Sequence, residues 1–176
     1  SVYFIFNIFN HNAANFAVKF ISPIFGILSL IFSFLVIKNI KKLTNPKIAF
    51  YSVIFLAFIP IFIDYSILSY VESMLVFFVV LSIYFLINEK IVLSGIAAGL
   101  SVLTKYNGLF ILPVLVYILY KKYGKDKNLF YKNSVIMIFI SLLIPSPWLI
   151  RNWMLLGNPI WPFLNFMFGG LEFESY

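Results

Sequence analysis

The stretch Ile91–Tyr120, IVLSGIAAGLSVLTKYNGLFILPVLVYILY, is apolar throughout except for one small polar cluster at residues 104–108. A charged side chain in the hydrocarbon of a membrane costs on the order of a few kcal/mol, so an intramembrane lysine is a candidate functional residue. The lysine of this cluster is Lys105. The structural alternative is a lysine whose long side chain reaches the membrane surface. The rest of the chain is interpreted outward from this cluster.

The composition predicts an integral membrane protein. Hydrophobic residues make up 62% of the chain and charged residues only 11%, which does not suit a water-soluble domain of this size. The apolar segments lack the alternation of a lipid-facing barrel strand, so we predict an all-α polytopic helical bundle. Because the sequence has no cysteine and a single histidine, His11, disulfides, thiol catalysis and multi-histidine metal sites are excluded.

Apolar segments between short polar connections predict the membrane spans. The predicted spans are residues 17–37, 48–63, 71–87 and 134–150, with 91–104 and 107–120 as a broken pair. Each half of that pair has about 14 residues, or roughly 21 Å, which is shorter than a hydrocarbon core of about 30 Å, so neither half needs to cross the membrane. Residues 1–10 predict an interfacial helix or a truncated span. Loops are predicted at residues 121–127 and 157–162.

The lysines predict the orientation of these spans. They cluster at residues 38–47, at 90 and at 121–132, and such an excess usually stays on the cytoplasmic side. A single helix over 91–120 would separate two of these clusters across the membrane, so the chain should break at Lys105. The extracytoplasmic side then receives the three tryptophans and four charged residues from separate parts of the chain, namely Asp64, Glu72, Lys105 and Arg151.

Carboxylates and cations gathered just below the outer surface suit the transfer of a group from a lipid-linked phosphate. A cation can stabilise the departing phosphate, and a carboxylate can take the proton of the attacking hydroxyl. Lys105 and Arg151 are the candidate phosphate ligands, and Glu72 is the candidate supporting carboxylate. Glu72 could instead be a carboxylate at a helix start, and Arg151 an interfacial arginine. Possible cavity-lining residues are Asp64, Tyr106, Asn107, Trp148 and Asn152.

Other features have simpler interpretations. Gly95 and Gly99 have the spacing that lets helices pack closely, so we interpret them as packing residues and not as a phosphate loop. His11 is interpreted as a hydrated loop residue, and Lys19 as a side chain that extends to the membrane surface. The basic loops are explained by membrane topology, and no nucleic-acid partner is predicted.

Three segments, in this order, resemble one enzyme family: YVESMLVFF at residues 70–78, GIAAGLSVLTKYNGLFILP at 95–113 and PSPWLIRNWMLLGNPIWPF at 145–163. Together with NIFNHNAANFAVK at residues 7–19, they resemble the GT-C glycosyltransferases of the dolichyl-phosphate-mannose protein mannosyltransferase type. The resemblance implies a GT-C-like bundle in the plasma membrane, or in the endoplasmic reticulum membrane of a eukaryote. It also implies a polyprenyl-phosphate sugar donor, an acceptor glycan, lipid or protein, and a reaction on the extracytoplasmic or lumenal side. It implies no firm cofactor and leaves a divalent metal open.

The resemblance also assigns individual residues. Glu72 stands where the family usually has an aspartate of its second outer loop, and Lys105 matches a Thr-Lys pair. Trp148 and the pair Arg151–Asn152 match the family's Pro-Trp and Arg-Asn. The family's principal acidic residue belongs to a first outer loop that we expect before Ser1, so the chain is expected to be an internal fragment, inactive by itself. A secondary transporter, a lipid flippase and a non-catalytic membrane subunit are the alternatives.

Overall fold

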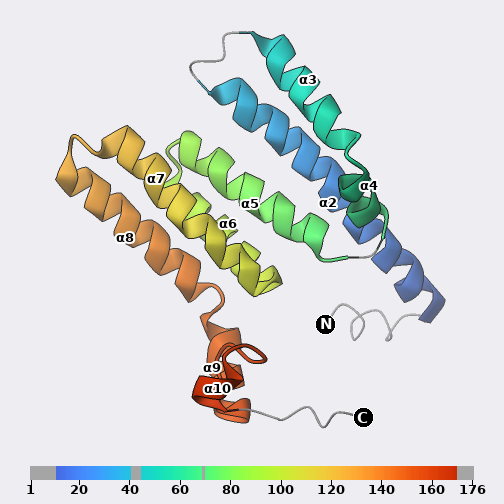
Figure 1. Ribbon diagram of the computed structural model, residues 1–176, viewed down its shortest axis with the longest axis vertical. Helices are drawn as coiled ribbons and strands as arrows, with labels where there is room; N and C mark the ends of the chain where they lie inside the picture. Colours follow the sequence, from blue (N-terminus) through green and yellow to red (C-terminus); the bar gives the residue numbers. More distant parts are fainter. Residues whose placement is uncertain (1–10, 41–44, 69, 170–176) are drawn as a thin grey trace.

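The computed structural model describes residues 11–40, 45–68 and 70–169, and these form long helices packed side by side with two short helices beyond one end (Figure 1). Their regular structure is entirely helical: α2 His11–Asn39, α3 Pro46–Ala57, α4 Pro60–Ile67, α5 Glu72–Ile87, α6 Ile91–Thr104, the 3-10 helix η1 Tyr106–Phe110, α7 Ile111–Tyr123, α8 Lys127–Leu143, α9 Ser146–Leu156 and α10 Asn165–Phe168. The prediction of an all-α membrane bundle is confirmed. The segment predicted as interfacial, residues 1–10, lies outside the described residues.

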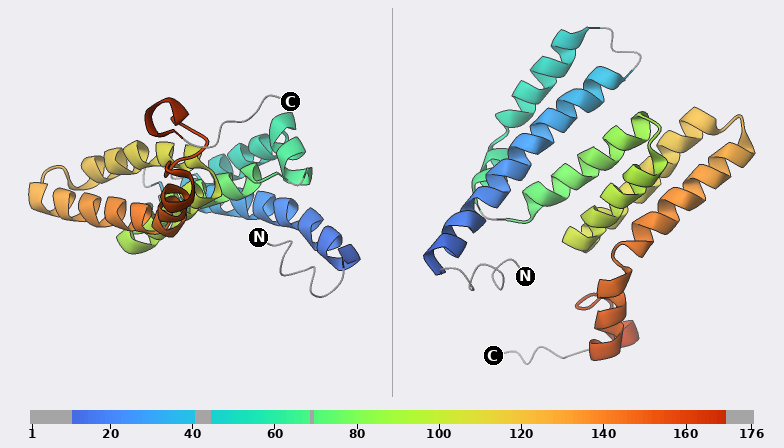
Figure 2. Two further views of the ribbon diagram at one scale, coloured as in Figure 1. Left: turned by 90° about the horizontal axis from the view of Figure 1, so that it is seen from below. Right: turned by 180° about the vertical axis from the view of Figure 1, so that it is seen from behind.

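Helix α6 is the central element of the bundle. It packs against α5 on one side and against α8 on the other, while α2 packs against the far side of α5, as Figure 2 shows from behind. The buried core lies where α5, α6, α7 and α8 meet, and consists of Leu86, Ala98, Ile111, Leu115, Leu119 and Met137. The predicted polar cluster therefore follows the most enclosed helix of the bundle.

Glycines allow α6 and α8 to approach closely. A Cβ atom at Gly95 would lie 2.9 Å from the carbonyl oxygen of Met137, and one at Gly99 would lie 2.6 Å from the Cβ of Ile144. Both distances are shorter than an ordinary van der Waals contact. The interpretation of these two glycines as packing residues is confirmed.

Two predicted spans are bent at prolines. The segment predicted as span 48–63 is not one straight helix, because α3 and α4 meet at an angle of 67°. Pro60 opens α4 and supplies no backbone N–H to continue α3. The segment predicted as span 134–150 is likewise divided between two helices, because α8 and α9 meet at 48°, with Pro145 preceding the first residue of α9.

Helix α8 also begins earlier than predicted. Lys127, assigned to a loop by its charge, is its first residue, and the carboxylate of Asp126 caps the helix by accepting a hydrogen bond from the backbone N–H of Leu129 at 3.0 Å. Asp64 was predicted to end a span, but it lies inside α4, which continues to Ile67.

Within the described residues, one helical segment is long and apolar enough to cross a membrane unaided, Lys19–Asn39 of α2. The bent pairs α3–α4 and α8–α9 also qualify when each pair is taken as one span. Helices α5 and α6 are apolar but shorter.

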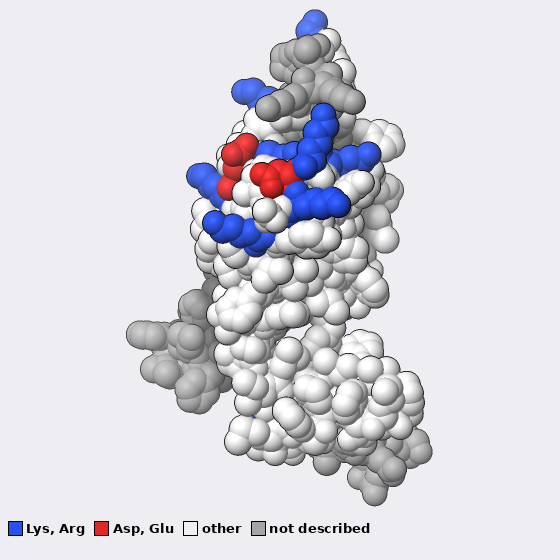
Figure 3. All heavy atoms as spheres, turned by 90° about the vertical axis from the view of Figure 1, so that its left-hand side faces the viewer, with Lys and Arg blue, Asp and Glu red and all other residues white. Residues whose placement is uncertain are grey.

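Charged side chains gather at one end of the bundle. There the ammonium of Lys122, near the end of α7, lies 3.0 Å from the carboxylate of Glu89, which precedes α6. The amide of Asn39 at the end of α2 donates to the side chain of Asn88 at 3.4 Å. In Figure 3 lysines and acidic residues form a band on this part of the visible face, and the face beyond it is largely uncharged. The chain therefore reverses direction between α6 and α7.

Candidate functional site

The reversal takes place within a few residues after Thr104. Lys105 adopts an extended conformation (φ −157°, ψ 136°), and η1 then leads directly into α7. The turn is closed by the backbone N–H of Gly108, which donates to the carbonyl of Lys105 at 2.8 Å. A Cβ atom at Gly108 would overlap the backbone carbonyl of Ser101, so only glycine lets η1 lie this close to α6. The close turn leaves Lys105 at the end of the bundle opposite the lysine-rich end.

Glu72 and Lys105 form an ion pair across the turn. The Lys105 ammonium donates to the Glu72 carboxylate at 2.7 Å, although the two residues are 33 positions apart in the chain. The side chain of Lys105 is 43% exposed and that of Glu72 is 27% exposed. Lys105 follows α6 and lies outside the apolar helices, and there the hydrogen bond to Glu72 and its negative charge raise the pKa of the ammonium. Lys105 is therefore held as a cation.

The hydroxyl of Tyr106 joins two further segments of the chain, α9 and the residues that follow it. It accepts hydrogen bonds from the indole N–H of Trp148 at 3.3 Å and from the amide of Asn152 at 3.2 Å. It donates to the backbone carbonyl of Trp161 at 3.4 Å. Asn152 is only 2% exposed, and a buried amide of this kind needs such a partner. The Tyr106 hydroxyl thus ties α9 and the segment after it to the turn.

Arg151 adds a second cation to this group. Its guanidinium lies 5.0 Å from the centre of the Trp148 ring, and one N–H donates to the side chain of Asn152 at 3.4 Å. Stacking on an indole orients a guanidinium while leaving several of its donors for a ligand. Arg151 itself is exposed.

A cavity of about 270 Å³ lies beside these residues. Its lining includes Lys105, Tyr106, Trp148, Pro145 and Phe163. The walls are therefore mostly aromatic and aliphatic, with the Lys105 ammonium as their cation. Such a lining suits a ligand that carries an anionic group on an apolar body.

The structure brings together Glu72, Lys105, Tyr106, Trp148, Arg151 and Asn152. Three predicted lining residues are absent from the cavity wall. Asp64 on α4 and Asn107 on η1 are exposed, and Asn152 is buried behind the hydroxyl of Tyr106. Across residues 11–40, 45–68 and 70–169 there is no group of three or more acidic or histidine side chains placed to hold a metal ion.

Sequence reasoning missed one part of the site, the segment after α9. Residues 157–162 were interpreted only as a loop, yet the Trp161 carbonyl contacts Tyr106 and the ring of Phe163 packs edge-on against the Tyr106 ring at 5.6 Å. The run of tryptophan, proline and phenylalanine in this segment is the signal that could have indicated burial against another aromatic residue.

A family model described as dolichyl-phosphate-mannose-protein mannosyltransferase matches residues 2–151. The chain belongs to this family. The matched region contains Glu72, Lys105, Trp148 and Arg151, whereas Asn152 and Trp161 follow it. No curated protein and no solved structure matches the chain. Membership places the chain among membrane glycosyltransferases.

Proposed function

We propose that the protein transfers a sugar from a polyprenyl-phosphate-linked donor to an acceptor on the extracytoplasmic or lumenal side of a membrane. The observation that carries the proposal is the Glu72–Lys105 ion pair beside an aromatic cavity, at the end of the bundle opposite its lysine-rich end. The family match supports sugar transfer as the type of reaction.

In the proposed reaction, an acceptor oxygen or nitrogen forms a bond to the anomeric carbon of the sugar as the bond from that carbon to the phosphate oxygen breaks. The acceptor proton passes to a base, and the polyprenyl phosphate departs with an additional negative charge. Cations placed where this charge develops lower the barrier. Lys105 and Arg151 are the cations that we assign to this role.

Glu72 is assigned a positioning role. Its carboxylate accepts a hydrogen bond from one of the three ammonium N–H groups of Lys105. The other two N–H groups can still donate to a phosphate. A carboxylate already paired with an ammonium is suited to fixing that ammonium in place. The acceptor proton is therefore assigned to a carboxylate other than Glu72.

The proposed topology has the lysine-rich end in the cytoplasm and the chain crossing the membrane several times. The positive-inside tendency supports this orientation. It places the turn at Lys105, and the cavity beside it, near the outer surface. Backbone that is not regular helix is tolerated there because it is buried in protein or lines a cavity. This arrangement of helices is the one expected of a GT-C enzyme.

The test measures sugar transfer by the intact protein in membranes, with dolichyl-phosphate-[³H]mannose as the donor probe. Lys105→Ala should lower transfer about 100-fold or more, since removal of one donor that stabilises a developing negative charge has effects of that order. Glu72→Ala should also lower transfer, because Lys105 loses the partner that positions it. The matched control is Lys125→Ala, which removes an exposed lysine at the opposite end. Wild-type transfer by both site variants would contradict the assignment.

A further inference from the structure

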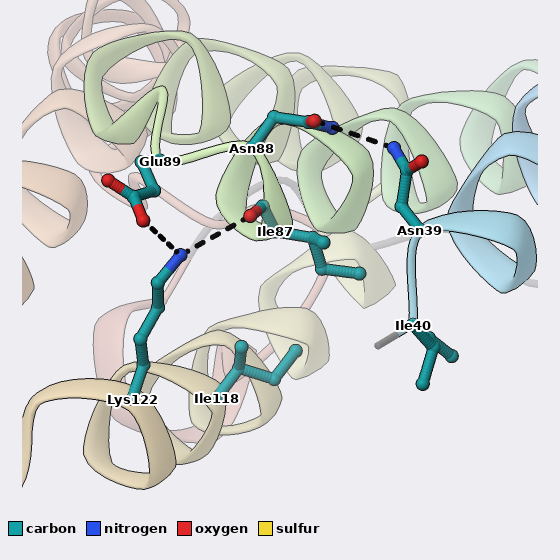
Figure 4. A pocket seen from close by; sticks show the side chains of 7 residues that line it. All are labelled: Asn39, Ile40, Ile87, Asn88, Glu89, Ile118 and Lys122. Atoms are coloured by element: carbon teal, nitrogen blue, oxygen red, sulfur yellow. Dashed lines mark hydrogen bonds and ion pairs between the residues drawn. The ribbon is translucent and has the colours of Figure 1, made fainter. Parts of the chain in front are cut away.

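A second cavity lies at the lysine-rich end of the bundle, far from Lys105 along α6. It has a volume of about 500 Å³, within the range of roughly 300–1,000 Å³ that is usual for small-molecule sites. Figure 4 shows its seven lining residues, which come from the end of α2, the turn between α5 and α6, and α7: Asn39, Ile40, Ile87, Asn88, Glu89, Ile118 and Lys122. The proposed sugar transfer gives this cavity no role.

The cavity presents one cation and one anion side by side. The Lys122 ammonium donates to Glu89 at 3.0 Å and to the Ile87 carbonyl at 3.3 Å, which leaves one of its three protons for a ligand. The side chain of Glu89 is 67% exposed, and one of its two carboxylate oxygens holds the Lys122 contact. Its other oxygen can accept a hydrogen bond from a ligand. Among the described lining residues, the charges of Lys122 and Glu89 cancel.

Three helix C-termini near the cavity can attract a cationic group. Helices α2, α5 and α7 all end here, at Asn39, Ile87 and Tyr123, and the carbonyl end of a helix carries a partial negative charge. Glu89 adopts a left-handed conformation with φ of 63°, which glycine or asparagine usually occupies and which is uncommon for glutamate. In this conformation the Glu89 carboxylate is directed to the Lys122 ammonium (Figure 4).

The remaining lining groups suit the other half of a zwitterion. The Asn39 amide donates a hydrogen bond to Asn88 at 3.4 Å, so its second proton remains for a ligand. Ile40 and Ile118 supply an apolar wall. The cavity lies where apolar helices end among lysines, which is the level of the lipid headgroups in a bilayer.

We propose that this cavity binds the headgroup of an ethanolamine phospholipid. The primary ammonium of the lipid lies on the free oxygen of Glu89 and near the helix carbonyl ends, and its phosphate accepts from Lys122 and Asn39. A purely anionic headgroup places no group opposite Glu89, and a choline headgroup cannot donate a hydrogen bond to it. The surrounding lysines attract anionic lipids to the surface in general, but without this arrangement of partners.

The test is native mass spectrometry of the purified protein in detergent, after incubation with equal amounts of phosphatidylethanolamine, phosphatidylcholine and phosphatidylglycerol. We expect one phosphatidylethanolamine to be retained in preference to the other two lipids. Glu89→Gln should lower its retention about tenfold, the effect of replacing a charged hydrogen bond by a neutral one, while phosphatidylglycerol retention should not fall. Lys122→Gln should lower it as well, and Lys125→Gln is the matched control that should leave it unchanged.

Three outcomes would overturn the proposal. Equal retention of phosphatidylethanolamine and phosphatidylcholine would show that the ammonium is not recognised. Preference for phosphatidylglycerol would show that the lysines attract lipids by charge alone. Unaltered phosphatidylethanolamine retention in both Glu89→Gln and Lys122→Gln, with the elution volume of the wild type in size-exclusion chromatography, would show that the lipid binds elsewhere.

Discussion

Replacing Gly108 by alanine should push η1 away from α6 and displace Lys105. The added Cβ atom would overlap the carbonyl group of Ser101 and would lie 2.6 Å from the backbone nitrogen of Val102. Both neighbours are backbone atoms of α6, so no side chain can rotate to make room. Lys105 lies between these two backbone segments, and its ammonium must move if they separate.

The size of the effect follows from these distances. Carbon atoms pack at about 3.5 Å or more, so η1 or α6 must shift by roughly 1 Å to admit the methyl group. Overpacking of this kind costs about 1–3 kcal/mol of the free energy of unfolding. We expect the upper end, because α6 is also confined by α8 at Gly95 and Gly99. For a domain of this size, about 3 kcal/mol corresponds to a decrease in melting temperature of roughly 6–12 °C.

The assay is thermal unfolding of the purified protein in detergent, followed by sugar transfer at a temperature where both proteins are folded. Asn107→Ala is the matched control, since it alters the neighbouring residue of the same turn but an exposed one. It should change the free energy of unfolding by no more than about 0.5 kcal/mol. The close contact between η1 and α6 would not have the role described if Gly108→Ala had the melting temperature of the wild type. The same would hold if Asn107→Ala lost as much unfolding free energy as Gly108→Ala.

Three further predictions concern other contacts. Tyr106→Phe should cost about 1–3 kcal/mol of unfolding free energy, because it leaves the buried amide of Asn152 without its acceptor. Tyr117→Phe, at a residue 58% exposed, should be near neutral. Equal denaturation midpoints for these two variants would contradict the prediction. Gly99→Ala should also cost about 1–3 kcal/mol, because its methyl group would press on α8, and an unchanged melting temperature would refute it. In a chain without native cysteines, Asp64→Cys and Lys125→Cys should react with an impermeant thiol reagent from opposite sides of the membrane, and labelling of both from one side would contradict the topology.

The position of the break at Lys105 could be predicted because two independent signals coincide there. A single polar cluster interrupts the apolar stretch, and the lysines on its two flanks require a reversal of direction. The pairing of Glu72 with Lys105 follows from the same reversal, since both residues then lie at one end. The distance between them, 2.7 Å, depends on how α5 packs against α6, and hydropathy carries no information about that.

The bends at Pro60 and Pro145 could not be predicted in the same way. Hydropathy marks the residues that avoid water, but the apolar pattern is the same for a straight span and for two helices that meet at 67° or 48°. The early start of α8 has a related cause. Lys127 is polar but lies inside a helix that Asp126 caps, and a capping side chain determines where a helix begins regardless of where the apolar region begins.

The cation of the site is flexible, but the backbone that carries it is rigid. Lys105 is partly exposed and has four rotatable bonds, so by itself it would define no position. Helix α6, however, is confined by α8 at Gly95 and Gly99 and by η1 at Gly108. At Gly95 and Gly108 a backbone atom occupies the place that a Cβ would fill, and at Gly99 the side chain of Ile144 does so. Because α6 cannot shift toward α8 or η1, the residue after its last turn has a fixed starting point, and Glu72 then needs to fix only the end of one side chain.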